Sequence, residues 1–133
     1  MKFDSSAVYE TSDSLNQCDI NKLYGFTDCG SAIHENSARF GWRWMKGQLE
    51  LHAYCYSDGI VRKQLLTNVK IGEEIYCMIK ISQSSYFFQV NELPVDTIPR
   101  GCSCDSLSKF RCFPYFGGTE TAPHDIKIKI KDQ

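Results

Sequence analysis

Two runs near the middle of the chain carry most of the side chains that could bind or transform a polar ligand. They are 37–44, Ser-Ala-Arg-Phe-Gly-Trp-Arg-Trp, and 49–56, Leu-Glu-Leu-His-Ala-Tyr-Cys-Tyr. In both runs, polar or aromatic residues alternate with apolar ones, which is typical of strands with one buried face. Guanidinium groups form paired hydrogen bonds to carboxylates, and phenols combine a flat apolar ring with a polar tip. These types favour recognition of a sugar ring or a uronate carboxylate.

The dipeptide Lys46-Gly47 between the runs sets their register if it forms a hairpin turn. The apolar face then pairs Trp44 with Leu49, Trp42 with Leu51, Phe40 with Ala53 and Ala38 with Cys55. The other face pairs Arg43 with Glu50, Gly41 with His52, Arg39 with Tyr54 and Ser37 with Tyr56. The candidate ligand-binding residues are therefore Arg39, Arg43, Glu50, His52, Tyr54 and Tyr56.

Two alternatives stay open for this hairpin. Arg43 and Glu50 can be an ordinary cross-strand ion pair on a solvated face, with the tyrosines as common strand residues. A slip of one residue would exchange the two faces, so that Trp42 and Trp44 would form the stacking surface instead.

The elements that position these runs are short alternating segments with almost no helical period, so we predict an all-β fold. Two antiparallel sheets packed face to face, in one domain over 1–133, fit the pattern better than a closed barrel. In the last segment, isoleucines alternate with lysines, which predicts one buried and one solvated face. All four prolines follow residue 93, so we expect the last third to be rich in loops. The predicted strands are Ala7–Thr11, Lys22–Phe26, Ser37–Met45, Gln48–Ser57, Val61–Leu66, Glu74–Ser82, Tyr86–Val90, Phe110–Tyr115 and Asp125–Lys131.

Composition limits the partners. The 133 residues include 15 Lys plus Arg and 16 Asp plus Glu, and a net charge of −1 gives no general attraction to nucleic acid or an anionic membrane. No apolar run is long enough to span a bilayer, and the first residues lack the apolar region of a signal peptide, so we expect a soluble domain. The charge is unevenly divided: residues 1–36 carry 2 basic and 6 acidic side chains, whereas the rest carry 13 and 10. The cationic main body makes an acidic ligand more plausible than the total suggests.

The seven cysteines give no zinc pattern, because there is no Cys-x-x-Cys pair. Cys55 and Cys77 fall inside apolar strand patterns and are predicted to be small buried hydrophobic residues. Cys102, Cys104 and Cys112 lie in or beside a Gly/Ser-rich stretch, where a disulfide is possible but not required. The redox compartment stays open.

Four segments together resemble the concanavalin A-like lectin/glucanase jelly roll, and more narrowly small uncharacterised domains of that kind from polysaccharide-degrading bacteria. They are the runs at 37–44 and 49–56, the latter with Asp58-Gly59, then Phe88-Gln-Val-Asn-Glu92, and Tyr115-Phe-Gly-Gly-Thr-Glu-Thr-Ala-Pro-His-Asp-Ile126. The resemblance covers roughly residues 3–131. It implies a β-sandwich whose concave sheet binds or cleaves a glycan, in an extracellular or cell-surface setting.

The resemblance implies two kinds of enzyme, which the sequence supports unequally. Retaining glucanases of this fold carry a strand of the form Glu-x-Asp-x-x-Glu or Glu-x-Asp-x-Glu, and this chain has none. Alginate-lyase-like members use Arg, Gln, His and Tyr on the concave sheet, and here Arg39, His52 and Tyr54 would supply those types, with Arg43 and Tyr115 as further candidates. Their Gln-Ile-His phrase is present only as Glu-Leu-His at 50–52, and their C-terminal Tyr-x-Lys phrase is missing.

Other sites are less well supported by the sequence. There is no phosphate-binding Gly loop followed by a Lys and a helix, and no Gly-x-Ser-x-Gly elbow. Relatives of this fold often hold a structural calcium through an acidic residue entering the last strand, which would be Asp125, although an ordinary turn is the default interpretation. His34 could line one end of a groove or be merely solvated.

The residues and the resemblance together predict a carbohydrate-binding, lectin-like domain that recognises a polysaccharide or oligosaccharide on its concave sheet, and the cationic main body favours an acidic one. It needs no cofactor, with calcium as a possible exception. A small polyuronate lyase using His52 and Tyr54 is the first alternative. A β-sandwich that contacts a protein partner, or a second copy of itself, is the second.

Overall fold

The computed structural model describes residues 1–103 and 109–132. Its elements are almost all strands, arranged in antiparallel sheets, which is consistent with the predicted β-sandwich. Two short helices are present, the 3₁₀ helix η1 (Ser5–Ala7) and α1 (Ser14–Gln17). The strands are β1 (Lys2–Phe3), β2 (Asn21–Thr27), β3 (Ser37–Met45), β4 (Gln48–Ser57), β5 (Ile60–Val69), β6 (Cys77–Ile81), β7 (Ser85–Val90), β8 (Leu93–Pro99), β9 (Arg111–Cys112) and β10 (Ile128–Lys129).

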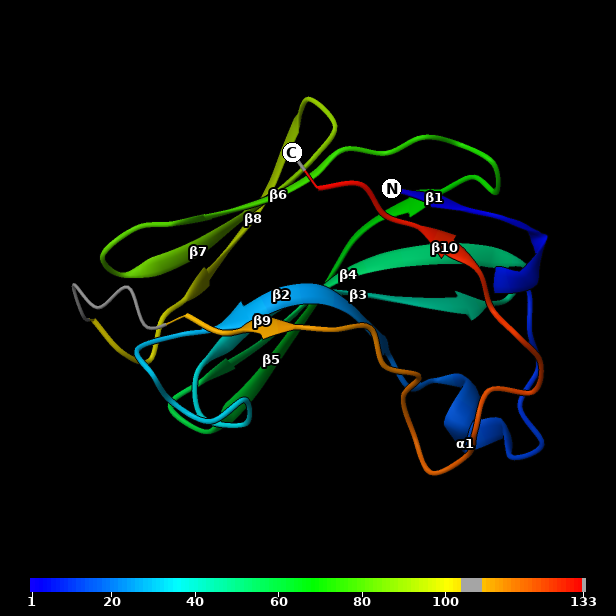
Figure 1. Cartoon of the computed structure of the whole chain (residues 1–133), viewed down its shortest axis with the longest axis horizontal. Coiled ribbons are helices and arrows are strands. Elements are labelled where there is room, and N and C mark those ends of the chain that lie inside the picture. Colours follow the sequence, from blue (N-terminus) through cyan, green and yellow to red (C-terminus); the bar gives the residue numbers. More distant parts are fainter. Residues whose placement is uncertain (104–108, 133) are drawn as a thin grey trace.

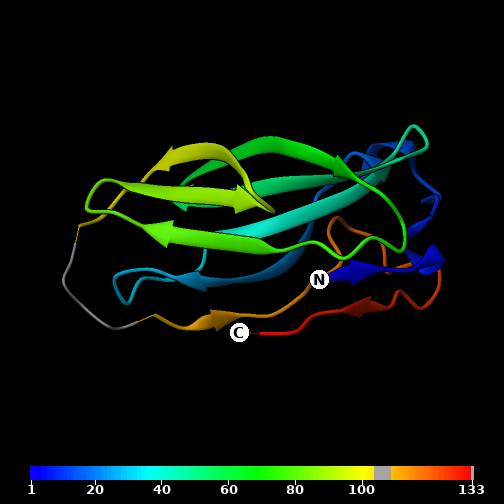
Figure 2. The same ribbon diagram turned by 90° about the horizontal axis from the view of Figure 1, so that it is seen from above.

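The strands form three sheets. The largest has the order β5-β4-β3-β2-β9, a second has the order β6-β7-β8, and β1 pairs with β10 (Figure 1). Figure 2 shows β9 and β10 along the same edge of the molecule, although they belong to different sheets. The consecutive strands β3, β4 and β5 form a meander in the largest sheet, and β3 and β4 carry the candidate site.

The core lies between the five-stranded sheet and the other two. Phe40 of β3 meets Phe88 of β7 with ring centroids 5.1 Å apart, and Phe3 of β1 meets Trp42 of β3 at 5.2 Å. Burying an apolar side chain of this size contributes about 1.5–3 kcal/mol each. Further fully buried members are Leu23, Leu49, Leu51, Ala53, Cys55, Tyr86 and Val90. One face of the five-stranded sheet is thus used for packing, which leaves the other for a ligand.

The register of the β3–β4 hairpin is the one predicted from the Lys46-Gly47 turn. All eight predicted cross-strand pairs are present, from Trp44 opposite Leu49 to Ser37 opposite Tyr56. Lys46 and Gly47 both have positive φ, 50° and 73°, which matches the right-handed twist of a two-residue hairpin turn. The faces are therefore not exchanged, and the tryptophans lie on the core side.

The predicted first strand, Ala7–Thr11, is wrong. Ser5–Ala7 is a 3₁₀ helix instead, and no strand is assigned from Val8 to Thr11. The Asp4 side chain accepts a hydrogen bond from the Ser6 backbone N–H at 2.8 Å, so a polar N-cap outweighs the weak alternation that follows it.

The expectation of a loop-rich last third is wrong in one place, because Leu93–Pro99 forms strand β8. β8 is an edge strand of the three-stranded sheet, and its prolines lie near its two ends. Proline has no backbone N–H to donate, but on the outer side of an edge strand there is no neighbouring strand to receive one, so proline is tolerated there.

Several predicted strands differ in length from the observed ones. β5 and β2 extend beyond their predicted ranges, whereas β6 is shorter than 74–82. Of 110–115 only Arg111–Cys112 is a strand, with an isolated bridge from Tyr115 to Lys22, and of 125–131 only Ile128–Lys129. The alternation of the last segment is still as predicted, since its isoleucines are half-buried and its lysines exposed.

Candidate functional site

The outer face of the β3–β4 hairpin carries all six predicted ligand-binding residues. Cross-strand pairing places Arg43 beside Glu50, His52 beside Gly41, and Arg39 beside Tyr54, with Tyr56 next along β4. A Cβ on Gly41 would lie 2.4 Å from Ile20 Cγ2, so the Ile20 side chain lies over the sheet where residue 41 has none. The six residues therefore lie on one face of the hairpin, with Ile20 covering the position of Gly41.

At one end of this face, three side chains form a hydrogen-bonded chain. Arg43 Nε donates to Glu50 Oε2 at 2.5 Å, and His52 Nε2 lies 2.9 Å from the same oxygen. Arg43 Nη1 also donates to the Cys18 carbonyl at 2.8 Å. These hydrogen bonds hold the three side chains together. The pairing of Arg43 with Glu50 is the cross-strand ion pair considered as an alternative in the sequence analysis.

The ionisation of this chain follows from its burial and contacts. Burial acts to raise the pKa of Glu50, but the hydrogen bonds from Arg43 and His52 outweigh it and hold that pKa below its ordinary value. Burial lowers the pKa of His52, and its contact with Glu50 offsets this only in part. At neutral pH, the carboxylate is charged and the imidazole is neutral.

Two tyrosines form the middle of the face. The rings of Tyr54 and Tyr56 have centroids 6.0 Å apart, and the exposed His34 ring lies 5.1 Å from Tyr56. Burial and a hydrogen bond with Tyr56 raise the pKa of Tyr54 to about 12. The phenol of Tyr54 therefore keeps its proton at neutral pH. His34 is exposed beside Tyr56, which fits both the groove and the solvated interpretation.

Arg39 is the least compensated charge on this face. It is only 5% exposed, and its Nε has no hydrogen-bond partner. Among the described residues no carboxylate lies within ion-pair distance of it; its contact is with the Tyr54 ring, whose centroid is 5.4 Å from Cζ. A buried N–H group without a partner is costly, because its lost hydrogen bond to water is not replaced.

The neighbouring β2 strand adds a second cation and makes room for Arg39. Lys22 Nζ lies 4.4 Å from the Tyr54 ring centroid, and burial together with Arg39 lowers the pKa of Lys22. A Cβ on Gly25 would lie 2.0 Å from the Ala38 carbonyl oxygen and 2.6 Å from Arg39 Cγ. Because Gly25 has no side chain, the Arg39 side chain has room to lie beside it over strand β2.

Lys22 was predicted to lie in a strand but was not included among the candidate ligand-binding residues. β2 pairs Lys22 with Gly41, which places it on the outer face, but the register then shifts between Lys22 and Gly25. A shift of this kind breaks simple alternation, so face assignments from the pattern fail along β2.

A second cluster of polar groups lies away from this face, between β2 and the end of β8. Asp28 is fully buried and accepts hydrogen bonds from Arg100 Nε at 2.8 Å and from the Tyr86 hydroxyl at 2.6 Å. Burial acts to raise the pKa of Asp28, but the hydrogen bonds from Arg100 and Tyr86 hold it below the ordinary value. This cluster is a fully satisfied structural tie across 72 residues of sequence.

Metal binding is weakly supported by the described residues. Asp28, Cys29 and Cys102 bring ligand atoms within 4.8 Å of one another, but Cys29 is disulfide-bonded and its sulfur is not available as a thiolate. Within the described part of the chain no such group includes Asp125, the predicted calcium ligand, which is exposed. The Asp28 group offers one carboxylate and two sulfur atoms, whereas calcium takes oxygen ligands.

The predicted burial of the strand cysteines holds for one of the pair. Cys55 is fully buried, and burial raises its pKa to about 12, whereas Cys77 is half-buried with a pKa raised to about 11 for the same reason. Both are free thiols, and Cys18, Cys102 and Cys112 are too. Cys104 lies outside the described residues.

No family model, no curated protein and no solved structure matches the chain. Within residues 1–103 and 109–132, no helix has the length and apolar character needed to cross a membrane. The function must therefore be argued from the site itself.

Proposed function

We propose that the chain is a carbohydrate-binding domain that recognises an acidic oligosaccharide or polysaccharide on the outer face of β3 and β4. In this proposal the sheets belong to a jelly roll of the concanavalin A-like kind. The observation that carries the proposal is Arg39, a buried guanidinium with an unpartnered Nε beside the tyrosines. A uronate carboxylate or a sugar sulfate would replace the hydration that this group has lost.

The other groups on the face support a sugar ligand more than a simple anion. The hydroxyls of Tyr54 and Tyr56 can bond to sugar hydroxyls, and Lys22 adds positive charge next to Arg39. The Arg43, Glu50 and His52 chain fixes one end of the face with side chains already held in position.

The geometry favours binding over the lyase alternative. The Nε2 atom of His52 is held by Glu50 at 2.9 Å. Because its pKa is raised to about 12, Tyr54 keeps its proton at neutral pH and is not available as a base. Neither residue is prepared to remove a proton from a bound uronate.

Calorimetric titration with four oligosaccharides tests the proposal: oligogalacturonate, alginate oligomers, heparin fragments and a neutral cello-oligosaccharide. We expect at least one acidic ligand to bind and the neutral one not to bind. Arg39→Met should weaken the acidic ligand at least about tenfold, which corresponds to about 1.4 kcal/mol.

Arg62→Met is the matched control, because Arg62 is an exposed arginine on β5 that pairs with the core-side residue Cys55. It should leave binding unchanged. Absence of binding to every acidic ligand would refute the proposal, as would equal loss in both variants. Ultraviolet absorbance from unsaturated products in the wild-type mixtures would instead establish the lyase.

A further inference from the structure

The segment that follows β8 brings a free thiol next to a disulfide-bonded sulfur. Cys29, in the turn that follows β2, is disulfide-bonded, whereas Cys102, just after the end of β8, is a free thiol. The sulfur atoms of the two residues lie within 4.8 Å of each other. A thiolate at this distance needs only a small movement to attack a disulfide sulfur, so the two residues are placed for thiol–disulfide exchange.

The fold holds the sulfur of Cys29 in position and places a cation beside it. The Cys29 N–H donates to Asp28 Oδ1 at 2.9 Å, and Arg100 Nη2 donates to Cys29 Sγ at 3.7 Å. Arg100 is fixed in turn by the hydrogen bond from its Nε to Asp28 Oδ2 at 2.8 Å. Negative charge spreads over the sulfur atoms when a thiolate attacks a disulfide, so a guanidinium at the attacked sulfur stabilises that charge.

The surroundings of Cys102 keep its thiol protonated at neutral pH. Burial and the Asp28 carboxylate raise the pKa of Cys102, and Arg100 offsets this only in part. Asp28 also accepts a hydrogen bond from the Tyr86 hydroxyl and lies 3.9 Å from Lys109 Nζ. Because the thiolate is the attacking species, exchange is slow at neutral pH and accelerates as the pH rises.

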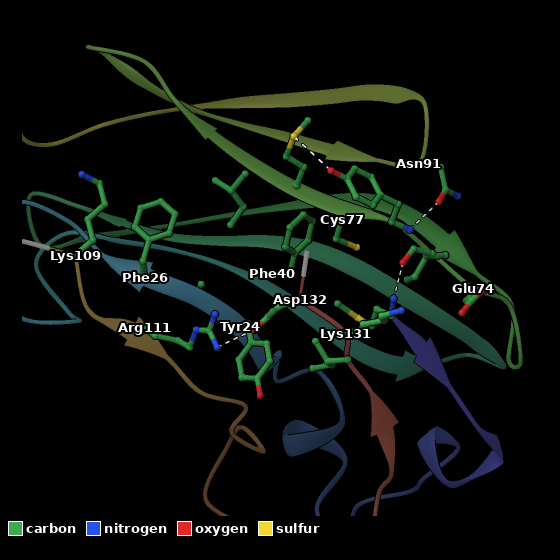
Figure 3. A pocket seen from close by; sticks show the side chains of 17 residues that line it. Tyr24, Phe26, Phe40, Glu74, Cys77, Asn91, Lys109, Arg111, Lys131 and Asp132 are labelled. Carbon is green, nitrogen blue, oxygen red and sulfur yellow. Dashed lines mark hydrogen bonds and ion pairs between the residues drawn. The ribbon is translucent and has the colours of Figure 1, made fainter. Parts of the chain in front are cut away.

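A cleft with a volume of about 900 Å³, lined by residues of β2 and β6, reaches toward this cluster and contains a contrasting thiol (Figure 3). Lys109, which lies beside Asp28, is one of its lining residues, and so is Cys77. Cys77 is a half-buried free thiol like Cys102, but it is not part of the close group formed by Asp28, Cys29 and Cys102. It is therefore a matched control for Cys102.

We propose that Cys102 and the disulfide of Cys29 form an exchange pair, in which Cys29 is bonded alternately to its present partner and to Cys102. The Cys102 thiol releases its proton, and its sulfur forms a bond to the Cys29 sulfur while the bond between Cys29 and its present partner breaks. The partner's sulfur leaves with the electron pair and takes up a proton. One disulfide and one thiol are present before and after the step, so no oxidant or reductant is consumed.

The exchanged bond joins the turn after β2 directly to the end of β8, beside the ion pair of Asp28 with Arg100. None of these residues belongs to the proposed sugar-binding face, so the exchange pair is a second property of the chain that does not depend on sugar binding.

Trapping with iodoacetamide tests the proposal on the oxidised, folded chain at pH 8.5 without reductant. The reagent alkylates the thiol that is free at each moment, and acid quenching, peptic digestion and mass spectrometry then identify the partner of Cys29. We expect two linkages of Cys29 in the wild-type chain. The linkage to Cys102 should be present in at least about one chain in ten, at a level independent of protein concentration.

Cys102→Ser should leave Cys29 with a single linkage, whereas Cys77→Ser should leave both. If Cys102→Ser does not fold by circular dichroism, the wild-type linkages decide the question alone. A single linkage of Cys29 in the wild-type chain, to whichever cysteine, would overturn the proposal, as would equal loss of the second linkage in both variants. Linkages of Cys29 to Cys18 or Cys112 as frequent as that to Cys102 would identify unspecific scrambling instead. A linkage to Cys102 that forms only at high protein concentration would identify exchange between chains, which also overturns the proposal.

Discussion

Arg100 and Arg39 both have largely buried side chains, but their hydrogen bonding differs. The side chain of Arg100 is 4% exposed and donates to both carboxylate oxygens of Asp28, at 2.8 and 3.1 Å, and to the carbonyls of Ser82 and Gln83. Arg39 is 5% exposed, and its Nε has no partner. The two differ in compensation: the charge of Arg100 is paired within the fold, whereas the buried Nε of Arg39 has no hydrogen-bond partner among the described residues.

The largest expected effect comes from removing the compensated arginine. Arg100→Met removes the nearest charge partner of the buried Asp28 carboxylate and leaves Lys109 Nζ at 3.9 Å, so we expect a cost approaching the roughly 3–5 kcal/mol typical of breaking a buried ion pair. Urea unfolding followed by tryptophan fluorescence measures this loss. A change below about 1 kcal/mol would mean that Asp28 and Arg100 are not the structural tie described above.

An intermediate effect is expected from pH, through His52. Burial lowers the pKa of His52 in the folded state, so the unfolded chain takes up the proton first as pH falls below about 6.5. Stability should therefore decrease from that pH downward until the folded pKa is reached, by about 1.4 kcal/mol for each unit of pKa depression.

His52→Gln should have a flatter stability profile between about pH 6.5 and 5 than the wild-type chain. Thermal unfolding at a series of pH values measures both curves. Parallel curves would show that His52 is not the group responsible.

The smallest expected effect is that of Arg39→Met on stability. Replacing an uncompensated buried charge by an apolar side chain of similar length is often neutral or stabilising, so we expect a change within about 1 kcal/mol of zero. The same urea experiment measures it beside Arg100→Met. A loss of the size expected for Arg100→Met would identify Arg39 as structural and remove the main support for the sugar site.

The sequence predicted the parts of the fold that depend on local chemistry. The turn at Lys46-Gly47 determined the β3–β4 register, and with it the shared face of the six candidate residues. It did not predict β8, because Pro94 and Pro99 are typical of loops unless they lie on an edge strand. The sequence also did not indicate the ion pair between Asp28 and Arg100, because a contact between residues 72 positions apart leaves no local pattern. That Arg39 lacks a partner is likewise a property of three-dimensional surroundings and has no signature in the sequence.

The two short turns of the β3–β4–β5 meander have a kinetic consequence. Lys46-Gly47 and Asp58-Gly59 have positive φ at all four residues, so each joins two long strands by a strongly preferred local geometry. Hairpins of this kind close in about 1–10 microseconds, whereas β9 must find β2 from far along the chain, as in the pairing of Gly25 with Cys112, which are 87 residues apart. We therefore expect the sheet that carries the proposed sugar site to form early in folding, with pulse-labelled hydrogen exchange protecting β3 and β4 before β9.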